Sequence, residues 1–165
     1  KIDNNVDNVN KFYLQFDRES AELDNGVFYG KCAELCGPSH ALMDFKVKSL
    51  SREAFDAWVA AMQATEGNTA DKEASDKGEA LFAQSCLACH AVTAVTGAGM
   101  GPNLTTFGDR NRVAGFLDHD VDSVVNWLQN SDELKPGNLM PLYDKMSDED
   151  AKAIAEYLMT LKVED

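Results

Sequence analysis

The chain has 165 residues, of which 44% are hydrophobic and 26% are charged, which suits a globular protein of one large or two small domains. The formal net charge of −13 argues against nucleic acid as a partner, because the phosphate backbone binds cationic surfaces. No run approaches the roughly 18 apolar residues of a membrane-spanning helix, and no secretory signal is visible.

The first 50 residues have the pattern of β-structure. KFYLQFD at 11–17 alternates apolar and polar side chains, which predicts a half-buried strand, and DNG at 24–26 predicts a turn. GVFYGK at 26–31 and ALMDFKVKSL at 41–50 are two further strand candidates that flank a cysteine-containing loop. Because the chain starts in what resembles the middle of a strand-and-turn region, we expect it to be a C-terminal fragment.

A helix and a linker follow this β-region. Ser51 can cap a helix over 51–64, whose apolar stripe holds Phe55, Val59 and Met62. Residues 65–73 are small and polar without periodicity, which is typical of a linker. These boundaries predict a first unit at 1–64 and a second at 74–165.

The second unit is predicted to be all-α. Helices are expected over 75–85, 122–131 and 147–162, with a Gly-rich loop at 90–115 between the first two. Ser147 is a favourable N-cap for the last helix, and acidic residues fill its first turn. The predicted buried stripe of that helix is Ala151, Ile154, Ala155, Leu158 and Leu161.

The sequence CLACH at 86–90 has the C-x-x-C-H spacing of a covalent haem c site. Cys86 and Cys89 would add to the two haem vinyl groups, and His90 would then be held at the iron as its proximal ligand. A thioredoxin-like motif needs a βαβ context, a zinc knuckle needs more ligands nearby, and two disulfides would normally join distant segments.

A second axial ligand is expected from Met140. It lies in KPGNLMP, a loop bracketed by prolines that can cross the opposite haem face, and methionine ligation raises the iron potential. The alternatives are Met100, close to His90 in the Gly-rich loop, Met146, expected to pack at the start of the last helix, and His119, expected to be a solvated loop residue.

The loop CAELCGPSHALM at 32–43 concentrates two cysteines, a histidine and a methionine, which are soft or borderline ligands that favour copper. A mononuclear blue-copper site uses one cysteine and leaves the second unexplained. A zinc site does not normally use methionine. Four such residues within 12 positions therefore look like one half of a copper site.

The stretch 74–165 resembles the class I c-type cytochromes. Gly78 and Phe82 match the family's G-x-x-x-F pattern, and Tyr157 matches the aromatic residue of its last helix, which crosses the first in close contact. Pro102 in GPNL matches the proline whose carbonyl accepts the N–H of the proximal histidine. We interpret Trp127 as core packing in preference to a haem-propionate contact.

The loop at 32–43 resembles the dinuclear CuA centre of cytochrome c oxidase subunit II. By this resemblance Cys32 and Cys36 would bridge two coppers, His40 and Met43 would be terminal ligands, and Glu34 would contribute its backbone carbonyl. The family's second histidine ligand comes from an upstream strand, and the sequence has no histidine before His40, so that ligand is absent from this chain.

Together the motifs predict a multidomain protein, in which a partial all-β cupredoxin (CuA) domain precedes an all-α cytochrome c domain, as in subunit II of caa3-type oxidases. The resemblance implies electron transfer from haem c to CuA and on to the oxygen-reducing subunit I. It also implies other oxidase subunits and an upstream donor such as a bc-type complex as partners. The expected location is the extracytoplasmic face of the bacterial cell membrane, with the family's membrane helices outside this chain.

Two other functions fit the same motifs. One is the CuA and cytochrome c subunit of a nitric oxide reductase. The other is a c-type cytochrome with a vestigial, metal-free cupredoxin domain that serves for docking, for which the missing histidine is the argument.

Overall fold

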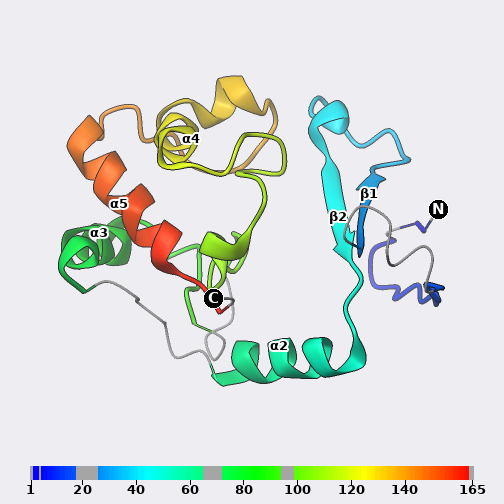
Figure 1. The fold of residues 1–165 in the computed structure, drawn as a ribbon. Coiled ribbons are helices and arrows are strands. Elements are labelled where there is room, and N and C mark those ends of the chain that lie inside the picture. Colours follow the sequence, from blue (N-terminus) through cyan, green and yellow to red (C-terminus); the bar gives the residue numbers. More distant parts are fainter. Residues whose placement is uncertain (1, 4, 18–25, 65–71, 94–98, 164–165) are drawn as a thin grey trace.

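The fold comprises a β-hairpin, one separate helix and a three-helix body. In the computed structural model, residues 2–3, 5–17, 26–64, 72–93 and 99–163 are described. The elements in order are β1 (Val27–Lys31), η2 (His40–Leu42), β2 (Asp44–Lys48), α2 (Arg52–Ala64), α3 (Lys72–Ser85), η3 (Phe107–Asp109), α4 (Val121–Leu134) and α5 (Asp148–Thr160). Figure 1 shows α3, α4 and α5 gathered in one body, with the hairpin beside it and α2 below. None of the helices in these ranges has the length and apolar character needed to cross a membrane.

The hairpin confirms the two strand candidates that flank the cysteine-containing loop. β1 and β2 pair antiparallel, with Tyr29 opposite Lys46 and Lys31 opposite Asp44. A salt bridge of 3.1 Å joins Lys31 to Asp44 at the loop end of the ladder. The hairpin therefore holds both ends of the loop at a fixed separation.

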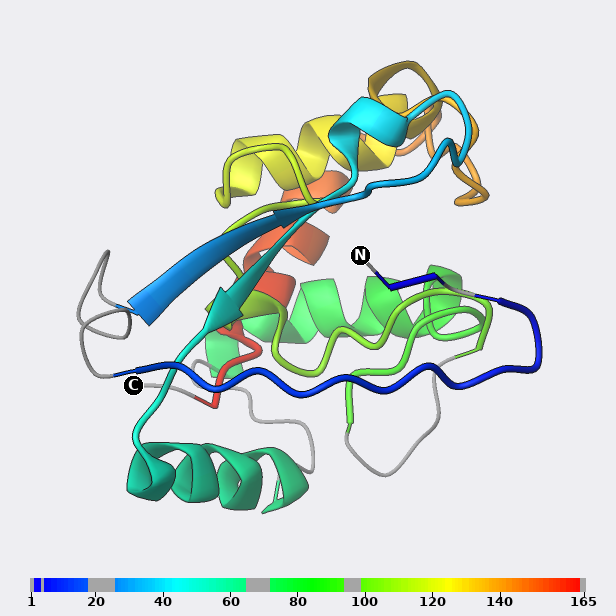
Figure 2. The same cartoon turned by 90° about the vertical axis from the view of Figure 1, so that its right-hand side faces the viewer.

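The strand predicted at 11–17 is not formed. Figure 2 shows this N-terminal segment as an extended trace on the hairpin side of the molecule, but no described strand pairs with it. Phe12 and Leu14 are 56% and 65% exposed, and only Phe16 finds an aromatic partner, Phe28, at 4.8 Å between ring centroids. An alternating pattern needs a neighbouring strand to become a ladder, and β1 and β2 pair with each other and not with this segment. The turn predicted at 24–26 lies outside the described residues except for Gly26.

Helix α2 begins as predicted, because the Ala54 amide donates to the Ser51 hydroxyl at 3.2 Å. The predicted stripe is only partly buried: Phe55 is 45% exposed, and Val59 and Met62 are half-buried. The periodicity thus predicts the helix correctly, but none of its residues is fully buried.

The core of the helical body confirms the stripe predicted on α5. Ile154 and Leu161 are fully buried, and Ser147 caps the helix by accepting a hydrogen bond from the Asp150 amide. On α3, a Cβ added to Gly78 would lie 2.1 Å from the carbonyl oxygen of Ala153, so only glycine permits this approach to α5.

Two further contacts hold α3 against α5. The rings of Phe82 and Tyr157 lie 5.7 Å apart, which confirms the close helix crossing that the resemblance predicts. Lys77 forms ion pairs with Glu149 at 2.7 Å and Asp150 at 2.9 Å, so it ties α3 to the first turn of α5. Helix α3 starts at Lys72, two residues before the predicted start of the second unit.

Candidate functional site

The C-x-x-C-H segment forms a tight turn at the end of α3. The Cys86 amide donates to the carbonyl of Phe82 at 2.8 Å, and the His90 amide donates to the carbonyl of Cys86 at 2.9 Å. Cys86 is buried, and this burial, helped by the neighbouring Cys89, raises the pKa of its thiol to about 11. Both cysteines are free, so neither is used for a disulfide.

The imidazole of His90 is fixed by a backbone carbonyl. Its Nδ1 lies 2.8 Å from the oxygen of Pro102, and because a carbonyl can only accept, Nδ1 carries the proton and the lone pair of Nε2 is free to bind a metal. A Cβ on Gly101 would come within 2.5 Å of the ring, so the absent side chain leaves room for the histidine. The resemblance predicts this role for Pro102.

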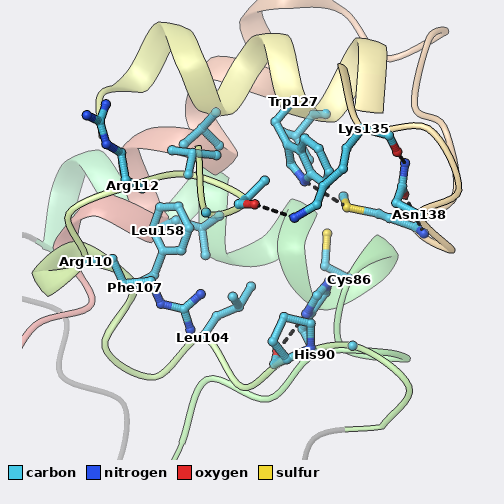
Figure 3. A pocket seen from close by; sticks show the side chains of 18 of the residues that line it. Cys86, His90, Leu104, Phe107, Arg110, Arg112, Trp127, Lys135, Asn138 and Leu158 are labelled. Carbon is cyan, nitrogen blue, oxygen red and sulfur yellow. Dashed lines mark hydrogen bonds between the residues drawn. The ribbon is translucent and has the colours of Figure 1, made fainter. Parts of the chain in front are cut away.

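A cavity of about 840 Å³ opens in front of these residues. Figure 3 shows Cys86 and His90 on one side of it, with Trp127, Lys135 and Asn138 across from them. Most of the remaining wall is apolar and includes Phe82, Leu104, Phe107, Val124, Leu128, Ile154 and Leu158. A large apolar cavity with two thiols and an imidazole at its wall fits a covalently bound haem.

Met140 also lines the cavity, and its loop is organised by a residue that the sequence analysis missed. Asn138 accepts a hydrogen bond from the Met140 amide at 2.9 Å, and its own side-chain amide donates to the carbonyl of Ser131 at 2.7 Å. The thioether sulfur of Met140 receives a hydrogen bond of 3.1 Å from the indole N–H of Trp127. Trp127 therefore does more than pack in the core. In the sequence, the asparagine two residues before the methionine was the available sign that this loop is held by side-chain hydrogen bonds.

The other axial candidates are placed less favourably. Met100 is 93% exposed and reaches the cavity next to Gly101, whereas Met146 packs against the core outside the cavity wall. His119 was expected to be solvated, but it is half-buried, and its Nε2 lies 2.8 Å from the carbonyl of Phe107. The ring of His119 packs on the ring of Phe107, and this contact draws the loop inward.

Cationic side chains lie at the same cavity. Lys135 donates to the carbonyl of Ala114 at 2.7 Å, and Arg110 donates to the carbonyl of Asn103. Burial lowers the pKa of the Arg110 guanidinium from its ordinary value. These cations suit the carboxylates of a haem, and sequence reasoning missed them because isolated basic residues in a loop follow no motif.

The second candidate site is the loop between β1 and β2. The sulfur of Cys36 lies 3.4 Å from that of Cys32, 3.5 Å from Nδ1 of His40 and 3.8 Å from the sulfur of Met43. The ligand atoms of the two cysteines and the histidine all lie within 4.8 Å of one another. This donor set of two thiolates, an imidazole and a thioether fits copper.

The loop backbone keeps the donors together. The thiol of Cys32 lies 3.3 Å from the carbonyl of Glu34, and the Cys32 amide donates to the carbonyl of Met43 at 3.0 Å, which closes the loop. The hydrogen bond between the two cysteine side chains raises the pKa of the Cys36 thiol. His40 is the one histidine of the sequence at this loop. The other two, His90 and His119, form hydrogen bonds with backbone carbonyls in the helical part.

Both parts of the chain match known families. A family model described as cytochrome c matches residues 75–162, which is more than half of the chain, and one described as the periplasmic domain of cytochrome c oxidase subunit II matches residues 1–50. The chain is 48% identical to the cytochrome c oxidase subunit 2 of Bacillus sp. (strain PS3), over 99% of this chain and 48% of that protein.

Two other relatives named cytochrome c oxidase subunit 2 match over the same extent. The protein of Bacillus subtilis is 46% identical over 99% of this chain and 48% of its own length, and that of Alkalihalophilus pseudofirmus is 43% identical over 99% and 46%. The chain therefore spans about half the length of the curated relatives it matches. With its haem-type cavity and this match, the chain belongs to the cytochrome c family, and its cytochrome c domain follows a segment that matches the periplasmic domain of cytochrome c oxidase subunit II.

Proposed function

We propose that this chain is the electron-transfer part of subunit II of a caa3-type cytochrome c oxidase. It would take electrons from an upstream respiratory donor such as a bc-type complex and pass them from haem c to CuA and then to subunit I. The observation that carries the proposal is the presence, in one chain, of a haem-type cavity and a convergent copper-type donor set. The subunit would work at the extracytoplasmic face of the cell membrane, together with the other oxidase subunits.

In this proposal Cys86 and Cys89 would hold a haem covalently, and His90 and Met140 would be the protein ligands of its iron. The haem iron and the copper pair would supply one-electron chemistry when bound. The chain's own residues fix the donors: Pro102 orients His90, Asn138 holds the Met140 loop, and the hairpin holds the copper loop. The apolar cavity wall excludes water, which keeps the reorganisation on electron transfer small.

In the copper loop, this chain's share of the copper ligands would be Cys32, Cys36, His40, Met43 and the carbonyl of Glu34. The second histidine would come from a segment outside this chain. We also propose the domain limits 1–64, 65–73 and 74–165, although α3 already begins at Lys72.

The test is the copper and iron content of the purified holoprotein that contains this chain. We expect twice as much copper as iron, and we expect Cys36→Ser to remove the copper but leave the iron and the haem spectrum unchanged. Leu35→Ala is the matched control, because Leu35 is 94% exposed in the same loop and is not a proposed ligand. Iron without copper in the unsubstituted protein would overturn the copper role, and absence of iron would overturn the haem role.

A further inference from the structure

The copper loop contacts the helical part directly. The hydroxyl of Ser39 donates to the carbonyl of Pro136 at 2.7 Å, across 97 residues of sequence. Ser39 is half-buried and precedes His40, whereas Pro136 opens the loop that ends at Met140. The contact therefore joins the two loops that carry the proposed copper and iron ligands.

Two turns of the helical part, each with a glycine, lie against the hairpin and its loop near this contact. Gly137 has φ +84°, and a Cβ built on it would lie 3.6 Å from Cδ of Pro38. Gly115 has φ +92°, and its Cβ would lie 3.7 Å from the carbonyl oxygen of Asp44. Both turns adopt a conformation that favours glycine, so their backbones can lie against the hairpin.

The hairpin also supplies part of the haem-type cavity wall. Tyr29, Phe45 and Lys46 line the cavity together with residues of α3 and α4, and the ammonium of Lys46 lies 5.2 Å from the centroid of the Tyr29 ring. The contact between the two parts thus extends from the copper loop to the edge of the cavity.

A continuous bonded route joins the proposed ligands across this contact. It runs from His40 to the adjacent Ser39, through the hydrogen bond to Pro136, and along a few residues to Met140. Asn138 stiffens the second half, because its side chain bonds both the Met140 amide and the carbonyl of Lys135. Electron tunnelling falls steeply with distance and is faster through bonded paths than through gaps, so this geometry favours direct transfer.

We propose that the Ser39–Pro136 hydrogen bond is the docking contact that positions the copper loop against the Met140 loop for electron transfer. The inference rests on the proposed function. The step moves one electron from the reduced haem to the oxidised copper pair, and no bond forms or breaks. Ser39 is a positioning residue, since it would bind neither metal.

The experiment compares Ser39→Ala, Ser39→Thr and the control Ser49→Ala in the holoprotein carrying both metals. Ser49 lies just after β2, away from the copper loop. The first readout is the single-turnover rate of electron transfer from haem to copper after rapid photoreduction of the haem. The second is amide hydrogen exchange across residues 137–140, which reports docking without any redox reaction.

We expect Ser39→Ala to lower the transfer rate by up to about fivefold, which corresponds to about 1 kcal/mol, the net contribution of one hydrogen bond. Exchange at 137–140 should rise with it, metal contents should stay unchanged, and Ser39→Thr should retain most of the rate because it keeps the hydroxyl. An unchanged rate and unchanged exchange in Ser39→Ala would overturn the docking contact. Absence of copper in the unsubstituted protein would instead contradict the proposed function.

Discussion

Replacing Gly78 with alanine tests the helix crossing on which the haem-type cavity depends. The new Cβ would lie 2.1 Å from the carbonyl oxygen of Ala153 and 2.7 Å from Cβ of Tyr157. Non-bonded heavy atoms prefer about 3.5 Å, so α3 and α5 must separate by about 1 Å. Overpacking of this kind costs about 3 kcal/mol, and the better helix propensity of alanine returns about 1 kcal/mol. The net destabilisation is therefore about 2 kcal/mol.

The measurement is thermal unfolding of the haem-loaded protein, followed by far-UV circular dichroism. A loss of about 2 kcal/mol lowers the Tm by about 10 °C in a domain of this size. Ala80→Gly, at an exposed position of the same helix, is the control, and it should lose only the propensity difference of about 1 kcal/mol. If propensity governed Gly78 as well, alanine would stabilise the protein, so a raised Tm would refute the close-crossing argument.

Three further substitutions test the haem ligand, its hydrogen bond and a helix cap. Met140→Ala should abolish the methionine–iron charge-transfer band and lower the haem potential by on the order of 0.1 V in a redox titration, whereas Met100→Ala should change neither. Trp127→Phe should keep the band but lower the potential, because the indole N–H draws electron density from the Met140 sulfur and so disfavours ferric iron; an unchanged potential would argue against this. A hydrogen bond from the Ser123 amide lowers the pKa of the Asp120 carboxyl in the folded protein below its ordinary value of 3.8. The ionised carboxylate therefore stabilises α4 fully above pH 3.8, and this stabilisation is lost as the pH falls through the lower pKa of the folded state. In urea unfolding, the free energy of unfolding should fall less steeply with decreasing pH for Asp120→Asn than for the unsubstituted protein, since asparagine also caps helices but carries no titrating carboxyl.

The features that local chemistry determines could be predicted from the sequence. The buried stripe of α5 follows from its 3.6-residue period, and Ser147 caps it as expected. The loop at 32–43 was predictable because ligand type and spacing are set by the metal chemistry. The Gly78 crossing was predicted from the resemblance, which supplies the partner helix that periodicity alone does not name.

The features that depend on distant partners could not be predicted. The alternation at 11–17 indicates a strand, but a strand forms only where another offers its hydrogen-bonding edge. Asn138 and Lys135 join the site through contacts with Ser131 and Ala114, which no motif links to them. The inward turn of His119 likewise depends on the packing of a ring from η3.

The different exposure of the two metal sites has a consequence for how the protein matures. The cavity lies between the core of the helical body and the hairpin, so this core packs well only when a bound group fills that volume. If the proposed haem fills the cavity, we therefore expect its attachment to accompany folding. The thiol of Cys36, in contrast, is at the surface of a loop already shaped by the hairpin. In the proposed function copper would therefore enter after folding, and a shortage of copper would leave a folded cytochrome rather than a misfolded one.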